Sequence, residues 1–180
     1  MDHMGEENEK RREYSRVDAH IPFEYRIIAR EEKDHVVARM YDDYPFSDVR
    51  PLPEVGDRDH ILDEWLKIMN TKLDTIIRLI TLQREGYFGL SFKAVNISGG
   101  GMSFFVPQAI SLGEILEIKI MLAFHQPIAL CIYGEVVKSE QREERHFIAV
   151  HYVHMDDSIR DEIIRFVFER EREIIREKKR

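Results

Sequence analysis

The stretch 116–122, Leu116-Glu117-Ile118-Lys119-Ile120-Met121-Leu122, alternates Leu or Ile with the charged residues Glu117 and Lys119. Side chains of a β-strand point alternately to opposite faces, so this pattern predicts a strand with one buried face. Similar strand patterns occur at 21–27, 88–94, 101–106, 128–137 and 147–153, with breaks at Gly113 and at the charge run 139–144. About six closely spaced strands predict a small antiparallel β-barrel.

The composition is that of one globular domain with an appendage. The 180 residues include 27 Lys and Arg against 34 Asp and Glu, a formal charge of −7. We find no run of eighteen apolar residues and no apolar segment typical of a signal peptide, so we expect neither a membrane span nor export. The single cysteine, Cys131, excludes an intrachain disulfide, and we expect a buried thiol in a cytoplasmic protein. The acidic total disfavours a protein that coats long nucleic acid.

A heptad pattern is the strongest periodic signal in the chain. It follows a loop rich in Pro and Asp, and its apolar positions are spaced alternately by four and three residues: Leu62, Leu66, Met69, Leu73, Ile76 and Ile80. Trp65, Ile77 and Leu79 widen this stripe beyond what a two-stranded coiled coil needs. We therefore predict a homo-oligomer, a tetramer more than a dimer. The alternative is a helix that packs on its own domain.

A second helix is predicted at the C-terminal end. Asp156, Asp157 and Ser158 are suitable N-caps, and apolar residues recur after them at helical spacing: Ile159, Ile163, Phe166, Val167 and Ile174.

Two short motifs are candidates for ligand binding. Asn96-Ile97-Ser98-Gly99-Gly100-Gly101 lies between two predicted strands, where residues without a Cβ atom allow close approach to the backbone. By itself this motif is a tight β connection. The second motif comprises Arg11, Arg12 and Arg16, which precede the first strand on a charged segment that we expect to be mobile. There it can fold over a bound anion.

The motif RRxxxR before the first strand and the motif [DN]xSxxG at a strand junction together resemble the PilZ domain, the bacterial receptor module for cyclic diguanylate (c-di-GMP). The resemblance extends over about 10–42 and 86–172, and it implies a six- or seven-stranded antiparallel barrel closed by a C-terminal helix. We thus predict that 1–42 and 86–180 form the barrel and its helix. The segment 43–85 is then an inserted loop and oligomerisation helix.

The resemblance also implies roles for individual residues. Arg12 and Arg16 would contact guanine and phosphate, with Arg11 in the same cluster. Asn96 would bond a guanine edge and Ser98 would donate its hydroxyl, while Gly100 and Gly101 would keep the backbone low beneath the ligand. Guanidinium groups suit these contacts because they grip phosphate oxygens or the O6 and N7 atoms of guanine in bidentate fashion. The sequence departs from the family pattern at Ala149, usually glycine, and at Tyr152, usually phenylalanine.

No pattern in the sequence predicts catalysis or a metal site, so we expect a non-enzymatic protein without a cofactor. The predicted function is a c-di-GMP receptor that signals when its arginine arm becomes ordered, with a downstream protein partner that the sequence does not identify. One alternative is a ligand-independent oligomeric scaffold that mediates protein–protein interaction. Another is a barrel that binds RNA or DNA through the arginine arm.

Overall fold

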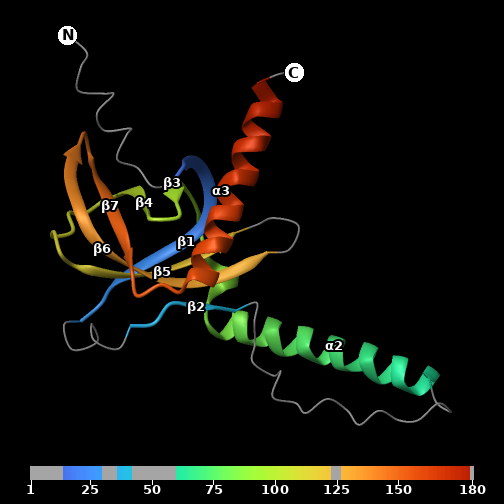
Figure 1. The fold of residues 1–180 in the computed structure, drawn as a ribbon. Helices are drawn as coiled ribbons and strands as arrows, with labels where there is room; N and C mark the ends of the chain where they lie inside the picture. The colour runs from blue at the N-terminus through green and yellow to red at the C-terminus, as the bar shows by residue number, and fades with distance from the viewer. Residues whose placement is uncertain (1–13, 30–35, 42–59, 123–126, 179–180) are drawn as a thin grey trace.

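The computed structural model describes residues 14–29, 36–41, 60–122 and 127–178, and Figure 1 shows its fold. Six strands form a closed antiparallel barrel in the order β6-β5-β1-β3-β4-β7, and β7 pairs back onto β6. Their bounds are β1 (Arg16–Ile27), β3 (Phe92–Ser98), β4 (Gly101–Val106), β5 (Ile115–Leu122), β6 (Ile128–Arg142) and β7 (Arg145–Val153). A short strand outside this closed ring, β2 (Arg39–Met40), pairs with Leu130 and Cys131 near the start of β6. The predicted fold class is confirmed.

The barrel closes around side chains from alternate positions of its strands. Along β5 the burial alternates as the sequence predicts, with Leu116, Ile118 and Ile120 fully buried. The same core contains Phe23 and Phe104, whose rings lie 4.9 Å apart. This continuous apolar core fixes the register of every strand, because a shift by one residue would expose a strand's apolar face.

Strand β1 is longer than the sequence predicted. The alternation had placed its start near Ile21, with Arg16 in the mobile arm, but Arg16 is the first residue of β1. Residues Arg16–Pro22 pair with Ser98–Phe92 of β3, and Phe23–Ile27 pair with β5. The strand is long because its first part pairs with one neighbour and its second part with the other, so that backbone groups along its whole length find partners.

Strand β6 also continues beyond its predicted end, through the charge run 139–144, which the sequence pattern predicts to be a break. It reaches Arg142, and Glu143 adopts a left-handed conformation (φ 54°) in the turn to β7. Glu140 pairs with Lys138 and Arg142 on one face of this hairpin, at 2.8 and 3.0 Å. The Arg142 guanidinium lies 4.3 Å from the centre of the Phe147 ring. Because these contacts give the charged side chains partners within the hairpin, a run of charged residues does not by itself predict the end of a strand.

The strand predicted to begin at Phe88 begins instead at Phe92. Gly86 adopts a left-handed conformation (φ 83°), and the 3-10 helix η3 (Tyr87–Gly89) follows it. The alternation of Phe88 and Leu90 therefore does not belong to the strand; Phe88 is exposed while Tyr87 is buried.

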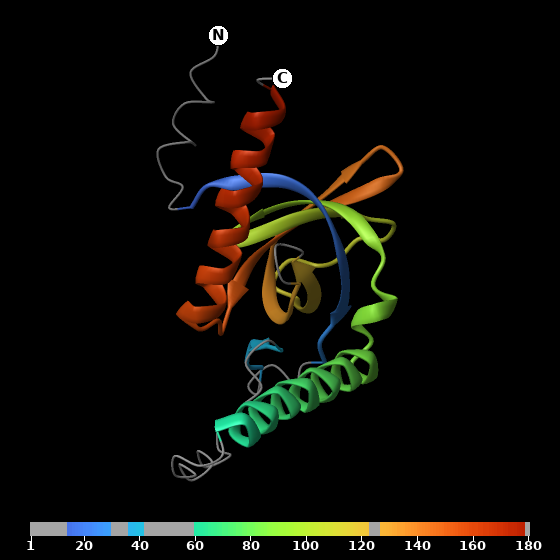
Figure 2. The same ribbon diagram turned by 90° about the vertical axis from the view of Figure 1, so that its right-hand side faces the viewer.

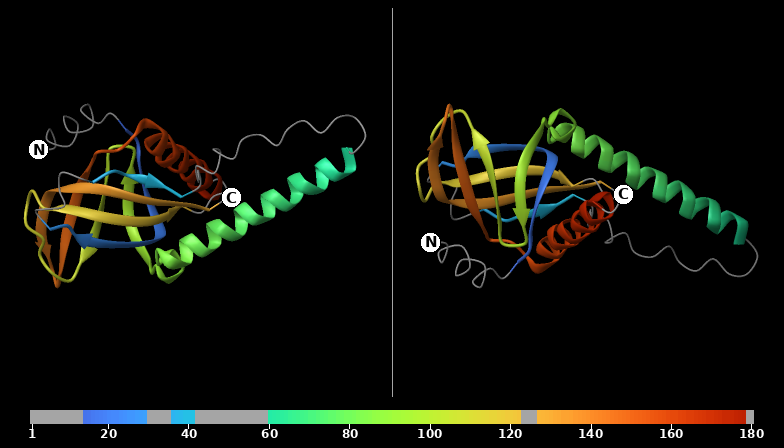
Figure 3. Two further views of the ribbon diagram at one scale, coloured as in Figure 1. Left: turned by 90° about the horizontal axis from the view of Figure 1, so that it is seen from below. Right: turned by 90° about the horizontal axis from the view of Figure 1, so that it is seen from above.

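The two long helices lie on different sides of the barrel. Helix α2 (His60–Arg84) projects away from it, and helix α3 (Asp157–Lys178) lies against it beside β1 and β3 (Figures 2 and 3). Ile159, Ile163 and Val167 of α3 are buried in the barrel core, as the helical spacing predicted. Neither helix, nor any other in the described part of the chain, is long and apolar enough to cross a membrane.

Candidate functional site

The glycine motif forms the turn between β3 and β4. Ser98 faces Gly101 across this turn. Its hydroxyl donates a hydrogen bond to the Gly101 carbonyl at 3.0 Å and accepts one from the Gly100 N–H at 3.3 Å. The Ser98 side chain is buried, so in this structure it holds the turn together. Its contact with a ligand stays a prediction.

Close approach explains why the turn contains glycine. A Cβ atom on Gly101 would lie 2.2 Å from the Val150 carbonyl oxygen of β7. At Gly99 it would lie 2.7 Å from the Ile164 side chain, and at Gly100 it would lie 3.2 Å from the Tyr14 ring. A Cβ atom on Gly101 would therefore strike backbone, whereas one on Gly99 or Gly100 would meet a side chain from α3 or from the segment before β1.

Arg16 lies beside this turn. It is the register partner of Ser98 in the ladder between β1 and β3, and it is exposed. Arg16, eighty positions before Asn96 in the sequence, therefore lies beside the glycine motif at one end of the barrel. Arg11 and Arg12 lie outside the described residues.

Asn96 lies two residues before Ser98, opposite Asp18 of β1. Its side-chain amide donates a hydrogen bond to an Asp18 carboxylate oxygen at 2.8 Å. This places a carboxylate next to the predicted guanine contact. The contact of Asn96 with guanine stays a prediction.

Helix α3 and the segment before β1 enclose the turn from the outer side. The Tyr14 ring lies over Gly99 and Gly100, and the Ser15 hydroxyl donates to the Glu171 carboxylate of α3. Arg160, in the first turn of α3, donates from Nη1 to the Gly99 carbonyl at 3.2 Å. Its guanidinium carbon lies 5.8 Å from the centre of the Tyr14 ring.

Sequence reasoning missed Tyr14, Arg160 and Ile164. Tyr14 carried one signal, since it is the first large apolar residue of a strongly charged segment. Arg160 carried none, because α3 contains several arginines at helical spacing and only the tertiary fold selects one of them.

Tyr152 lies beneath the turn. Its backbone N–H donates to the Gly100 carbonyl at 3.1 Å, and its ring is buried in the barrel core. Burial raises the pKa of Tyr152, and the charge of Arg16 opposes that rise. Among the residues that the structure describes, none provides a hydrogen-bond partner for its buried hydroxyl oxygen. The tyrosine in place of the family's usual phenylalanine thus adds a polar atom near Arg16. Ala149, the other departure, pairs with Ser103 of β4.

The hollows of the described surface lie away from the glycine turn. Two hollows of about 550 and 590 Å³ adjoin the turn of the β6–β7 hairpin and share Phe105, Glu144 and Arg145. They lie toward the Phe92 end of β3, away from Ser98. Within the described ranges, no group of three His, Cys, Asp or Glu side chains is arranged to hold a metal ion.

The predicted heptad stripe is exposed along α2. Its six positions expose between 37% and 59% of their surface: Leu62, Leu66, Met69, Leu73, Ile76 and Ile80. Trp65 and Leu79 beside the stripe are exposed as well, whereas Leu82 in the last turn is buried against Tyr87 and Ala129. Among the described residues, α2 is buried against its barrel at its C-terminal end, and the six stripe positions are exposed.

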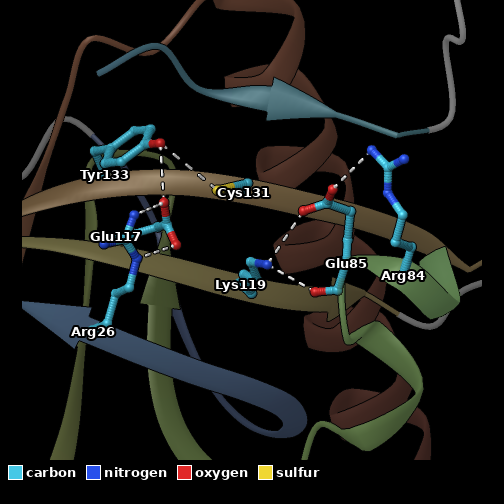
Figure 4. A network of polar contacts seen from close by, with 7 residues as sticks. All are labelled: Arg26, Arg84, Glu85, Glu117, Lys119, Cys131 and Tyr133. Carbon is cyan, nitrogen blue, oxygen red and sulfur yellow. Dashed lines mark hydrogen bonds and ion pairs between the residues drawn. The ribbon is translucent and has the colours of Figure 1, made fainter. Parts of the chain in front are cut away.

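A polar network fixes that end of α2 to the barrel (Figure 4). Lys119 of β5 donates from Nζ to the Glu85 backbone carbonyl at 2.7 Å, and it lies 3.5 Å from the Glu85 carboxylate. Nearby, Arg26 forms two hydrogen bonds to the Glu117 carboxylate, at 2.8 and 3.0 Å. Cys131, buried in the same region, has a pKa raised to about 11, mainly by burial. The prediction of a buried thiol is confirmed.

The fold and the site define a small β-barrel module that presents one glycine turn beneath an arginine and a C-terminal helix. A sequence model of the PilZ domain family matches residues 75–169, which is more than half of the chain. The chain belongs to the PilZ domain family. The match covers the end of α2, the strands β3 to β7 and most of α3, but not β1 or the arginine motif.

Among solved structures, a pathogenic protein from Xanthomonas campestris has a similar fold. That protein is described as a tetrameric PilZ domain that self-assembles through an unusual helical bundle. The two chains share 20% sequence identity with a TM-score of 0.57, over 91% of each chain. This likeness supports the fold. A search of curated proteins finds none that matches the chain.

Proposed function

We propose that this protein is a c-di-GMP receptor that does not act as an enzyme and that assembles through α2. The observation that carries the proposal is the pairing of Arg16 with Ser98 in the ladder between β1 and β3, which sets an exposed arginine beside the glycine turn. A small anion with two phosphates and two guanines suits such a site, since guanidinium binds both groups. Arg11, Arg12 and Asn96 complete the proposed contacts. The division into a barrel and an inserted segment at 43–85 is part of this proposal.

The proposed signal is a rearrangement of the segment around Arg11 to Arg16. In this structure Tyr14 covers Gly99 and Gly100, and the Ser15 hydroxyl donates a hydrogen bond to Glu171 of α3. A ligand that binds above the turn must exchange these contacts for its own. The surface formed by the arm and α3 then changes, and a downstream protein partner reads the change.

Calorimetric titration with c-di-GMP tests the proposal. We expect the wild type to bind with a Kd in the micromolar range or below. Arg16→Ala should weaken binding more than tenfold, because a hydrogen bond to a charged group contributes about 1.5–3 kcal/mol. Arg84→Ala is the control, since Arg84 lies in the last turn of α2, outside both motifs, and its side chain is exposed. Equal heats for wild type and Arg16→Ala would refute the assignment.

The second candidate function is a ligand-independent scaffold. Two observations favour it: the Ser98 hydroxyl and the Asn96 amide already have partners within the protein, and the α2 stripe is exposed. The same titration separates the two functions. The scaffold gives no heat with c-di-GMP and nevertheless self-associates.

A further inference from the structure

Arg160 of α3 is a partly buried cation at the edge of the glycine turn. Its side chain exposes 24% of its surface, and its Nε atom lies 4.0 Å from the Asp157 carboxylate. Asp157 is 99% exposed, so water and salt weaken this attraction. The guanidinium therefore keeps most of its charge available at the turn.

The hydrogen bonds of Arg160 leave room for a ligand. A guanidinium group has five N–H donors. One of them bonds the Gly99 carbonyl at 3.2 Å, and the Tyr14 ring lies beside the group at 5.8 Å. A neutral carbonyl and an aromatic ring neutralise no charge. An anion that displaced Tyr14 would meet the remaining donors.

The position of Arg160 complements that of Arg16. Arg16 reaches the turn from β1, at the Ser98 side, whereas Arg160 reaches it from α3, at the Gly99 side. Two cations that flank one turn from different elements stabilise an anion between them more than either cation does alone.

We infer that Arg160 is a phosphate-binding residue for the cyclic dinucleotide, so that α3 forms a wall of the ligand site. This inference rests on the proposed function and extends it to a residue outside both sequence motifs. On ligand binding, Arg160 exchanges part of its contact with Gly99 and Tyr14 for the phosphate. That exchange couples the ligand to α3 directly.

Two substitutions test the inference by calorimetry with c-di-GMP. Arg160→Gln keeps an N–H donor for the Gly99 carbonyl but removes the charge, whereas Arg160→Lys keeps the charge. We expect the Gln variant to bind about tenfold more weakly, with a shallower dependence on salt, and the Lys variant to lie between it and the wild type. Arg165→Gln is the matched control, because Arg165 lies on the same helix, is 64% exposed and pairs with Glu162.

The outcomes distinguish this inference from the proposed function. If the wild type binds and Arg16→Ala weakens binding while Arg160→Gln binds like the wild type, the inference is wrong and the receptor function stands. If the wild type does not bind, both are wrong. An NMR titration of the wild type avoids any folding defect of a variant: the Arg160 Nε–H resonance should shift with c-di-GMP and that of Arg165 should not. An unmoved Arg160 resonance in a bound protein would also overturn the inference.

Discussion

At the residue scale, the pairing of β4 with β7 requires a residue without a Cβ atom at Gly101. Gly101 pairs with His151 of β7, and the atom that a Cβ would strike, the Val150 carbonyl oxygen, belongs to backbone. The strands must separate to accommodate it. Gly101→Ala should therefore lower the free energy of unfolding by about 3 kcal/mol, measured by urea denaturation. Gly89→Ala is the control because its Cβ meets nothing within 4 Å. An unchanged urea midpoint for Gly101→Ala would contradict the close approach.

Glu117 makes stability depend on pH. Burial favours its protonated form, but the hydrogen bonds and charge of Arg26, the hydrogen bond from Tyr133 and the charge of Lys119 together outweigh burial and lower the pKa of Glu117 below its ordinary 4.5. A lowered carboxyl pKa stabilises the fold above pH 4.5, and the contribution is lost as the pH falls below that value toward the folded pKa.

Glu117→Gln should thus destabilise the protein at pH 7 and much less near pH 3. Because the Arg26 side chain is 56% exposed, the difference at pH 7 should be only about 1 kcal/mol. Denaturant unfolding of both proteins at the two pH values measures it. A difference that stayed constant with pH would show that the Glu117 carboxylate is not the group responsible.

At the scale of elements, helix α2 depends on its C-terminal anchor. The ammonium group of Lys119 bonds the Glu85 carbonyl just after the last helical residue, where unpaired carbonyls and the helix dipole favour a cation. Lys119→Met keeps an unbranched side chain of similar length but removes this bond and the ammonium group that lies 5.7 Å from the centre of the Tyr87 ring.

We expect Lys119→Met to fray the last turn of α2, with amide hydrogen exchange around residues 81–86 faster by about tenfold. Lys67→Met is the control, because Lys67 is exposed and its ion pair is with Asp63, one turn earlier in the same helix. Identical exchange in Lys119→Met and wild type would mean that Leu82 alone holds the helix end.

The sequence predicted elements well where a pattern reports burial directly. Alternation located β5 and β7, and helical spacing located α2 and α3, because one face of each pattern is apolar. It failed for the end of β6, where Glu140 pairs with Lys138 and Arg142 within the strand. It also failed at Phe88, because the conformation of Gly86 is not visible in hydrophobicity.

At the scale of the whole molecule, the site is assembled by long-range contacts. The family motifs led to Arg16 and Ser98, and their predicted proximity agrees with the register of β1 and β3. Tyr14, Gly99 and Arg160 meet only because α3 returns to the first strand. Such contacts depend on tertiary packing, and no local periodicity encodes them. A single sequence could therefore predict the turn but not what covers it.

The exposed face of α2 leads to the last prediction, which concerns assembly. A helix that projects from its barrel with Leu66, Leu73 and Ile76 uncovered presents an apolar surface that an isolated monomer rarely maintains. The heptad spacing matches a second copy of the same helix, and the widened stripe favours more than two. We expect sedimentation to give a mass several times the chain mass of 21.4 kDa, with a tetramer favoured.

Leu73→Asp should shift that mass toward the single chain while the barrel stays folded, because it introduces a charge into each copy of the seam. Thr71→Asp is the matched control, because it introduces the same residue two positions away, about 200° around the helix axis. The Thr71 hydroxyl donates its hydrogen bond to the Lys67 carbonyl of the same helix. Near-UV circular dichroism confirms the barrel in each variant. A monomeric wild type, or a Leu73→Asp variant of unchanged mass, would assign the stripe to something other than self-association. An oligomer that dissociates in Leu73→Asp and persists in Thr71→Asp would locate the interface on this face of α2.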